Sequence, residues 1–171
     1  GGDDFDAEKG CFPEPRFFVI FDDAGLISDE DREKGVTLEP VSFGRDHPDV
    51  KSVDYRATFK MPPGAYDILY CPGGEITECG HSNFFLISGG KIITAPLSRV
   101  LKGTTRTAVI DLAKSEGYTV EERCPLWSEL SGASEAFVTG SMKLVVPAVK
   151  IGGITIADGK MILELTDFGA N

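Results

Sequence analysis

One clear helix stands among many short strand-like runs, and this contrast limits the folds open to the chain more than any other feature. The helix is predicted for residues 104–116, where Thr104 or Thr105 can cap the first turn and Gly117 is suited to end the last. Its apolar face is formed by Val109, Ile110, Leu112 and Ala113. We therefore expect one main helix.

Short apolar or alternating runs predict strands along much of the remaining chain. These runs cover residues 17–21, 36–43, 66–70, 83–87, 91–94, 119–123, 136–139, 144–149 and 154–156. Gly89-Gly90 joins two of them and is a good hairpin signal. A solvated turn or short helix is expected at 28–34, and a short helix is one option for 126–132. Many strands with one main helix indicate an α+β or mixed α/β fold.

The length of 171 residues suits a single domain with a well-formed core. Residues 1–16 are acidic and show no periodicity, so we expect a loose segment followed by one folded domain at 17–171. The beginning lacks the apolar region of a signal peptide. No window approaches the roughly 18 apolar residues of a membrane span. A net charge of −10 argues against nucleic acid as a partner.

The cysteines and histidines do not form a recognisable metal pattern. The four cysteines are Cys11, Cys71, Cys79 and Cys124. Their spacing is irregular, and the chain has only two histidines. We expect no metal site and four reduced thiols in a cytoplasmic protein.

Two charged residues could serve a cofactor that carries an aldehyde and a basic ring nitrogen. Lys51 lies in an extended segment between Val50 and Val53, and a lysine there can form a Schiff base with the aldehyde. Glu78 precedes a predicted strand, and a carboxylate against a pyridine nitrogen keeps that nitrogen protonated. Tyr55 could bond the phenolic oxygen, although a buried core tyrosine is at least as plausible. Taken singly, a surface lysine and an exposed glutamate are the commoner interpretations.

Two turns of small residues could hold a phosphate. Gly103-Thr104-Thr105 begins the predicted helix, where backbone N–H groups and hydroxyls can surround an anion. Thr139-Gly140-Ser141 is a second such turn, between two strands. An ordinary helix start and a plain hairpin turn are the alternatives. Lysine, carboxylate and both turns occur in order over about ninety residues, which strengthens the cofactor hypothesis.

Several motifs together resemble one enzyme family. They are Glu78-x-x-x-Ser82-Asn83-x-Phe85, Leu101-x-Gly103-x-Thr105-Arg106, Glu122-Arg123, Ser134-Glu135-Ala136-Phe137 and Thr139-Gly140-Ser141 through Pro147. Their order and spacing resemble the C-terminal, cofactor-binding domain of the class IV (fold type IV) pyridoxal-phosphate aminotransferases. That family includes branched-chain and D-amino-acid aminotransferases and 4-amino-4-deoxychorismate lyase. The resemblance covers roughly residues 17–157.

The resemblance implies roles for individual residues. Lys51 would form the Schiff base with pyridoxal 5'-phosphate, Glu78 would face the pyridine nitrogen and Leu101 would pack against the ring. The other residues expected to hold the cofactor are Tyr55, Thr104, Thr105, Gly140 and Ser141. The backbone of Ser141 and Met142 would face the substrate carboxylate. Lys51 would be the catalytic residue.

The resemblance implies a transaminase that passes an amino group from an amino acid to a 2-oxo acid, in a protein that is a homodimer. A lyase acting on an amino-chorismate-like substrate, and a non-catalytic binding or scaffold module, remain alternatives. The sequence departs from the family at Asp54, where asparagine is usual, and at 61–64, which cannot be helical. The family's small N-terminal domain is not expected in this chain, so low activity is expected from these residues alone.

Overall fold

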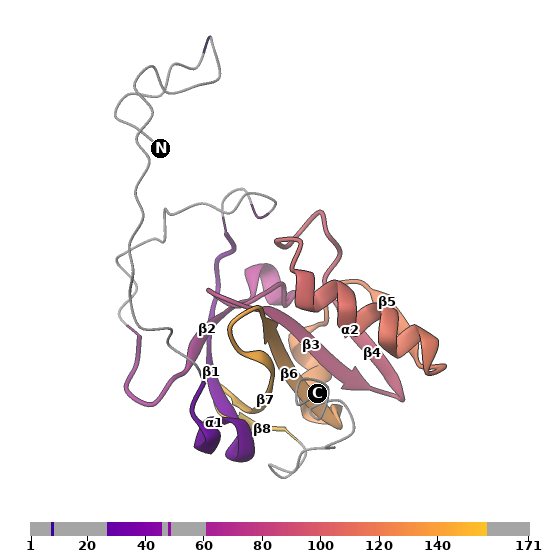
Figure 1. Ribbon diagram of the computed structural model, residues 1–171. Coiled ribbons are helices and arrows are strands. Elements are labelled where there is room, and N and C mark those ends of the chain that lie inside the picture. Colours follow the sequence, from indigo (N-terminus) through magenta and orange to yellow (C-terminus); the bar gives the residue numbers. More distant parts are fainter. Residues whose placement is uncertain (1–7, 9–26, 46–47, 49–60, 157–171) are drawn as a thin grey trace.

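The computed structural model describes residues 27–45 and 61–156, with residues 8 and 48 as isolated positions (Figure 1). The predicted strand at 17–21 and the predicted site residues Lys51 and Tyr55 lie outside the described residues. Within the described part, one mixed eight-stranded sheet dominates and carries few helices. The prediction of a mixed α/β fold, mostly strands with one main helix, is confirmed.

The sheet combines parallel and antiparallel pairs. Its strands are β1 (Val36–Val41), β2 (Asp67–Tyr70), β3 (Asn83–Ser88), β4 (Lys91–Thr94), β5 (Thr119–Glu122), β6 (Glu135–Gly140), β7 (Leu144–Ile151) and β8 (Ile154–Thr155). The order across the sheet is β2-β1-β7-β6-β3-β4-β5, and β8 pairs with β7. β1 runs parallel to β2 and β7, and β4 runs parallel to β5, whereas the other pairs are antiparallel. β3 and β6 therefore lie side by side inside the sheet, with Asn83 opposite Thr139.

The hairpin predicted at Gly89-Gly90 joins β3 and β4. Ser88 pairs with Lys91, which leaves the two glycines as a two-residue loop. Their φ angles are 58° and 73°, the left-handed region that the favoured two-residue hairpin turn requires at both positions. A second hairpin joins β7 to β8 through Gly152 and Gly153.

The predicted helix is α2 (Thr104–Ser115), and it lies along the β3–β4–β5 end of the sheet (Figure 1). Its buried apolar side chains are Val109, Ile110 and Ala113, whereas Leu112 is only half-buried. They cover an apolar cluster that includes Phe85 and Phe137, whose rings stack with centroids 4.8 Å apart. Gly117 follows the helix with a φ of 84°, as predicted for its end.

The predicted capping residues of α2 were wrong. Gly103 occupies the N-cap position and no side chain caps the helix, so Thr104 and Thr105 are its first two residues. The first N–H groups of an α-helix have no partner within the helix. Without a side-chain cap, the N–H groups at the start of α2 are available to an external acceptor.

The opposite face of the sheet carries the larger core. It includes Leu38, Leu69, Phe84, Val138 and Val146, all buried. A 3-10 helix, η2 (Trp127–Gly132), adds buried Leu130 to this core. It lies in the segment 126–132, for which the sequence indicates a short helix as one possibility. A one-turn 3-10 helix, η1 (Pro72–Gly74), follows β2. The short helix α1 (Asp29–Lys34) precedes β1, and the Ser28 hydroxyl caps it by accepting from the Asp31 N–H.

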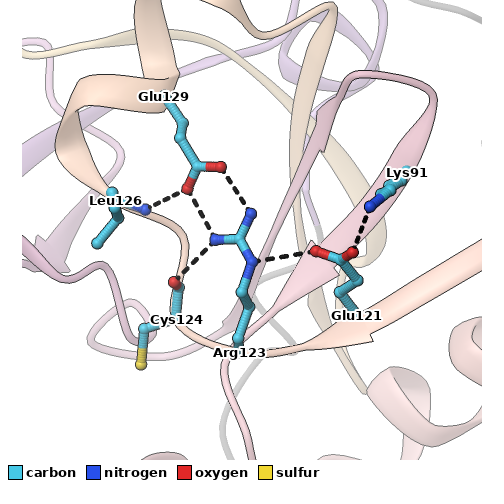
Figure 2. Close-up of polar contacts among 6 residues, drawn as sticks. All are labelled: Lys91, Glu121, Arg123, Cys124, Leu126 and Glu129. Carbon is cyan, nitrogen blue, oxygen red and sulfur yellow. Dashed lines mark hydrogen bonds and ion pairs between the residues drawn. The ribbon is translucent and has the colours of Figure 1, made fainter.

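An ion-pair network holds the connection between β5 and η2 (Figure 2). The Arg123 guanidinium donates to both carboxylate oxygens of Glu129, at 2.8 and 2.6 Å, and to Glu121 at 3.0 Å. Glu129 also accepts from the Leu126 N–H, and Lys91 of β4 donates to Glu121. A single exposed ion pair adds little to the stability of a protein. A network around a bidentate arginine also fixes the geometry of the segments that it joins.

Cys71, Cys79 and Cys124 are free thiols, and Cys11 lies outside the described residues. No helix in the described segments combines the length and the apolar character needed to cross a membrane.

Candidate active site

A cavity of about 290 Å³ opens between the start of α2, the turn from β6 to β7 and the segment before β3. The predicted site residues that line it are Glu78, Leu101, Thr104, Thr105, Gly140, Ser141 and Met142. They come from segments that are up to 64 positions apart in the sequence, counting from 78 to 142. The structure thus brings together every predicted site residue that it describes, while their individual roles remain predictions.

Glu78 is held by a tight backbone loop. Its carbonyl accepts from the Tyr70 N–H at 2.9 Å, and an isolated bridge pairs it with Asn83. The buried Asp67 carboxylate holds the loop between them, because it accepts from the His81 N–H at 3.0 Å. Gly80 fits against the same carboxylate, and a Cβ at this position would lie 2.7 Å from Asp67 Oδ1. Glycine and aspartate together allow the chain to turn so sharply after Glu78.

The Glu78 carboxylate is almost completely buried, with 2% of the residue exposed. Its Oε2 accepts from the Leu101 N–H at 3.1 Å and from the Asn83 amide at 3.3 Å. Arg45 Nε lies 3.3 Å from Oε1, close enough for charge attraction, but Oε1 accepts no hydrogen bond. Burial raises the pKa of Glu78 to about 7, and attraction to Arg45 and the Leu101 N–H opposes this rise. Glu78 can therefore hold or release a proton near neutral pH.

Asn83 connects two walls of the cavity. Its amide Nδ2 donates to the Leu101 carbonyl at 2.9 Å in addition to Glu78. Gly103 packs so closely against the Asn83 amide oxygen that a Cβ there would collide with it. The carboxylate and the start of α2 are thus held in register by one buried side chain.

The other end of the cavity is rich in donors and carries no acidic side chain among its lining residues. The Thr104 hydroxyl lies 3.3 Å from the Ser141 hydroxyl, which links the start of α2 to the β6–β7 turn. Thr105 and Gly140 line the same end. Uncapped N–H groups, a positive helix end and converging hydroxyls form an environment that suits an anion such as phosphate.

Arg45, Lys143 and Thr139 are among the cavity residues that sequence reasoning did not assign to the site. Arg45, which also donates to the Gly80 carbonyl at 2.8 Å, stands in a stretch without periodicity or motif. Lys143 follows the predicted turn, and Thr139 was considered only as part of that turn. No pattern in the sequence indicated that these residues line the same cavity as Glu78.

Two deeply buried polar atoms of the cavity have no hydrogen-bond partner. They are Glu78 Oε1 and the Thr139 hydroxyl oxygen, and Thr139 is 1% exposed. Buried polar groups are nearly always paired, so these two atoms are compatible with a polar ligand in the cavity. A flat ring with a protonated nitrogen and a phosphate tail matches this set, with Glu78 at one end and the start of α2 at the other. Lys51 and Tyr55, the remaining predicted cofactor residues, lie outside the described residues.

Comparisons with known proteins show the family of this chain. A family model described as amino-transferase class IV matches residues 2–151. A probable branched-chain-amino-acid aminotransferase of Aquifex aeolicus is 42% identical over 96 residues, which are 55% of this chain and 31% of that protein. A D-alanine aminotransferase of Listeria monocytogenes is 36% identical over 97 residues, which are 56% of this chain and 34% of that protein. The alignments thus span about a third of these curated relatives.

Solved structures show the same fold. The T.th. branched-chain amino acid aminotransferase, solved with pyridoxamine 5'-phosphate, matches with a TM-score of 0.65 and 26% identity over 79% of this chain and 48% of that one. A 4-amino-4-deoxychorismate lyase of Pseudomonas aeruginosa matches with a TM-score of 0.71 over 85% of this chain and 58% of that one, and its 19% identity shows the fold alone. The chain belongs to the amino-transferase class IV family and has its type IV fold.

Proposed function

We propose that this chain forms the cofactor-binding part of a pyridoxal-phosphate-dependent aminotransferase, which transfers an amino group between an amino acid and a 2-oxo acid. The single observation that carries the proposal is the cavity. One buried carboxylate with an unpartnered oxygen lies at one end, and converging hydroxyls at an uncapped helix start lie at the other. Family membership supports the choice of cofactor.

The residues that would hold the cofactor can be assigned by their chemistry. Glu78 would accept a hydrogen bond from the protonated ring nitrogen, because its Oε1 accepts no hydrogen bond and its surroundings are buried. Thr104, Thr105 and Ser141 would bind the phosphate with hydroxyl and backbone N–H groups. Leu101 would provide an apolar contact for the ring. When bound, the cofactor would supply an electron sink for the bond-breaking step at the substrate.

Glu78 acts by holding a proton at a defined place. With a pKa of about 7, its carboxyl group can share a proton with a basic nitrogen at neutral pH. Arg45 keeps part of the negative charge on Glu78, since attraction to the guanidinium lowers the pKa that burial raises. Asn83 and the Leu101 N–H fix the carboxylate plane by bonding to Oε2, and Oε1, which lies beside Arg45, accepts no hydrogen bond. Lys51 would provide the amine that attaches the cofactor and moves the proton at the substrate carbon.

The first test is cofactor capture. Pyridoxal phosphate added to the purified chain should produce a visible absorption band, and borohydride reduction followed by mass spectrometry should locate the attachment on Lys51. Lys51→Ala should abolish both signals, whereas Lys102→Ala, at an exposed lysine outside the cavity, should retain them. Absence of the band in the unaltered chain would contradict the proposal and favour a scaffold role.

The second test addresses the proton at Glu78. Glu78→Gln should bind the cofactor but slow a single turnover with an amino acid, because a neutral amide cannot keep the ring nitrogen protonated. Glu75→Gln, at a partly exposed glutamate outside the cavity, is the matched control. An undiminished single-turnover rate would remove Glu78 from this role. Amine exchange that depends on a 2-oxo acid supports the transaminase, whereas release of pyruvate from an amino-chorismate would identify a lyase.

A further inference from the structure

Thr139 lines the cavity from the end of β6, on the face of the sheet that α2 covers. It comes two residues after Phe137, and side chains two positions apart in a strand point to the same face. Phe137 belongs to the apolar cluster beneath α2, so Thr139 lies on this face as well. Because the Ser141 hydroxyl lies 3.3 Å from the Thr104 hydroxyl, the end of β6 is also close to the first turn of α2.

The Thr139 side chain carries a buried polar group without a partner. The residue is 1% exposed, and its hydroxyl oxygen makes no hydrogen bond within the described part of the chain. Thr94 on β4 is also 1% exposed, but its hydroxyl donates to the Phe84 carbonyl at 2.8 Å. The fold therefore satisfies one of these two buried hydroxyls and leaves the one that lines the cavity unpaired.

The residues around Thr139 indicate which group of a ligand the hydroxyl meets. Asn83, opposite Thr139 on β3, already uses both amide N–H groups, one to Glu78 and one to the Leu101 carbonyl. The carboxylate end of the cavity is thus bonded through Asn83, whereas Thr139 directly precedes the β6–β7 turn at the other end. A threonine hydroxyl can donate one hydrogen bond, and a phosphate group offers three strong acceptor oxygens.

We propose that the Thr139 hydroxyl donates to a phosphate oxygen of the ligand and makes the cavity select phosphorylated over unphosphorylated ligands. This inference rests on the proposed function, to which it adds a specificity-determining residue. The alternatives are that the hydroxyl meets the ring of the ligand, or that it serves only the stability of the fold. The three roles differ in what loss of the hydroxyl does to ligands with a phosphate, to ligands without one and to the ligand-free protein.

The first test compares pyridoxal 5'-phosphate with pyridoxal, which has the same ring and aldehyde but no phosphate. The affinity of the chain for each is measured from the visible absorption band. Thr139→Val should weaken binding of pyridoxal 5'-phosphate roughly 10- to 100-fold, the range for loss of a hydrogen bond to a charged group, and leave the affinity for pyridoxal unchanged. Thr139→Ser keeps the hydroxyl and should restore most of the lost affinity. Equal weakening of both ligands, or no change in either, would overturn the inference.

A second readout does not depend on the cofactor. Inorganic phosphate is titrated into the cofactor-free chain, and its dissociation constant is measured by calorimetry. Thr139→Val should weaken phosphate binding at least 10-fold, and Thr139→Ser should not. Thr94→Val, at an equally buried threonine outside the cavity, is the matched control and should bind phosphate as the unaltered chain does. Absence of phosphate binding in the unaltered chain, or equal binding by Thr139→Val, would refute the role of Thr139.

Urea unfolding of the ligand-free chain separates a ligand-binding hydroxyl from a structural one. Thr139→Val should unfold at the same urea concentration or a higher one, because it removes an unpaired buried polar group. Thr94→Val should unfold at a lower concentration, since it removes a hydroxyl that is bonded to the Phe84 carbonyl. A lower midpoint for Thr139→Val would show that its hydroxyl is bonded within the fold and would overturn the inference. Failure of the proposed function would appear separately, as absence of cofactor attachment to Lys51 in the unaltered chain.

Discussion

The titration of Glu78 should control how the stability of the cofactor-free protein depends on pH. Burial raises the pKa of Glu78 from an ordinary 4.5 to about 7 in the folded protein. The folded state therefore binds this proton more tightly than the unfolded chain, and the protonated form stabilises the fold. That contribution is fully present below about pH 4.5 and is lost as the pH rises through about 7.

The size of the effect follows from the difference between the pKa of Glu78 in the unfolded chain and its pKa in the folded protein. One pKa unit corresponds to about 1.4 kcal/mol of free energy. The rise in the pKa of Glu78 from 4.5 to about 7 therefore changes the free energy of unfolding by roughly 3 kcal/mol. Glu78→Gln is neutral at every pH and cannot show this loss. The free energy of unfolding of the unaltered chain should therefore fall relative to Glu78→Gln by roughly 3 kcal/mol between about pH 4.5 and pH 8.

Urea denaturation at a series of pH values measures this difference. The single tryptophan, Trp127, packs against the larger core and provides a fluorescence signal for unfolding. Glu116→Gln, at an exposed glutamate after α2, controls for the loss of one negative charge. Parallel curves for the unaltered chain and Glu78→Gln, or a difference that grows in the opposite direction, would refute the electrostatic account of this carboxylate.

Three further perturbations test the surroundings of the cavity. Arg45→Met should raise the pKa of Glu78 above about 7, because attraction to the guanidinium now lowers it; carbon-13 NMR titration of the Glu78 carboxyl measures the change. Gly103→Ala should reduce the free energy of unfolding by about 1–3 kcal/mol, since the new methyl group collides with the Asn83 amide. Leu144→Asn should increase it by about 0.5–1 kcal/mol, because Leu144 has a φ of 56°, which asparagine adopts more readily.

Each of these expectations has a clear counter-result. An Arg45→Met variant with an unchanged or lower Glu78 pKa would mean that the guanidinium does not act on this carboxylate. Gly132→Ala, where a Cβ would meet open space, is the control for Gly103→Ala, and equal effects at both positions would contradict the collision. A less stable Leu144→Asn variant would show that packing of the leucine outweighs its backbone strain.

Elements with a strong local signal were predictable from the sequence. The two-glycine loop after β3 and the apolar face of α2 follow from backbone freedom and from helical spacing. The N-cap of α2 was harder to predict, because threonine and glycine are both common N-cap residues and the contact that excludes a Cβ at Gly103 comes from Asn83, which is distant in the sequence. A steric contact between residues that are distant in the sequence cannot be deduced from the local residues at the start of the helix.

The candidate site was predictable where the spacing of several motifs carried information. Glu78, the start of α2 and the turn at Gly140 were identified because each has a recognisable neighbourhood. Arg45 and Lys143 were not, since a single basic residue in a turn or loop is ordinarily solvated. Their placement depends on which strands pair, and the sequence does not specify that pairing locally.

The arrangement of β3 has a practical consequence for labelling the protein. Asn83, at one end of the strand, belongs to the cavity, whereas the Gly89-Gly90 loop follows Ser88 at the other end. Five strand steps of about 3.3 Å separate Asn83 from Ser88 by roughly 17 Å. A Cβ on either glycine would meet no neighbouring atom. Both glycines have a left-handed φ that would strain any other residue, so the label belongs at exposed Lys91, directly after the loop. A fluorophore or an affinity handle at that position leaves the ligand-binding end of the strand untouched.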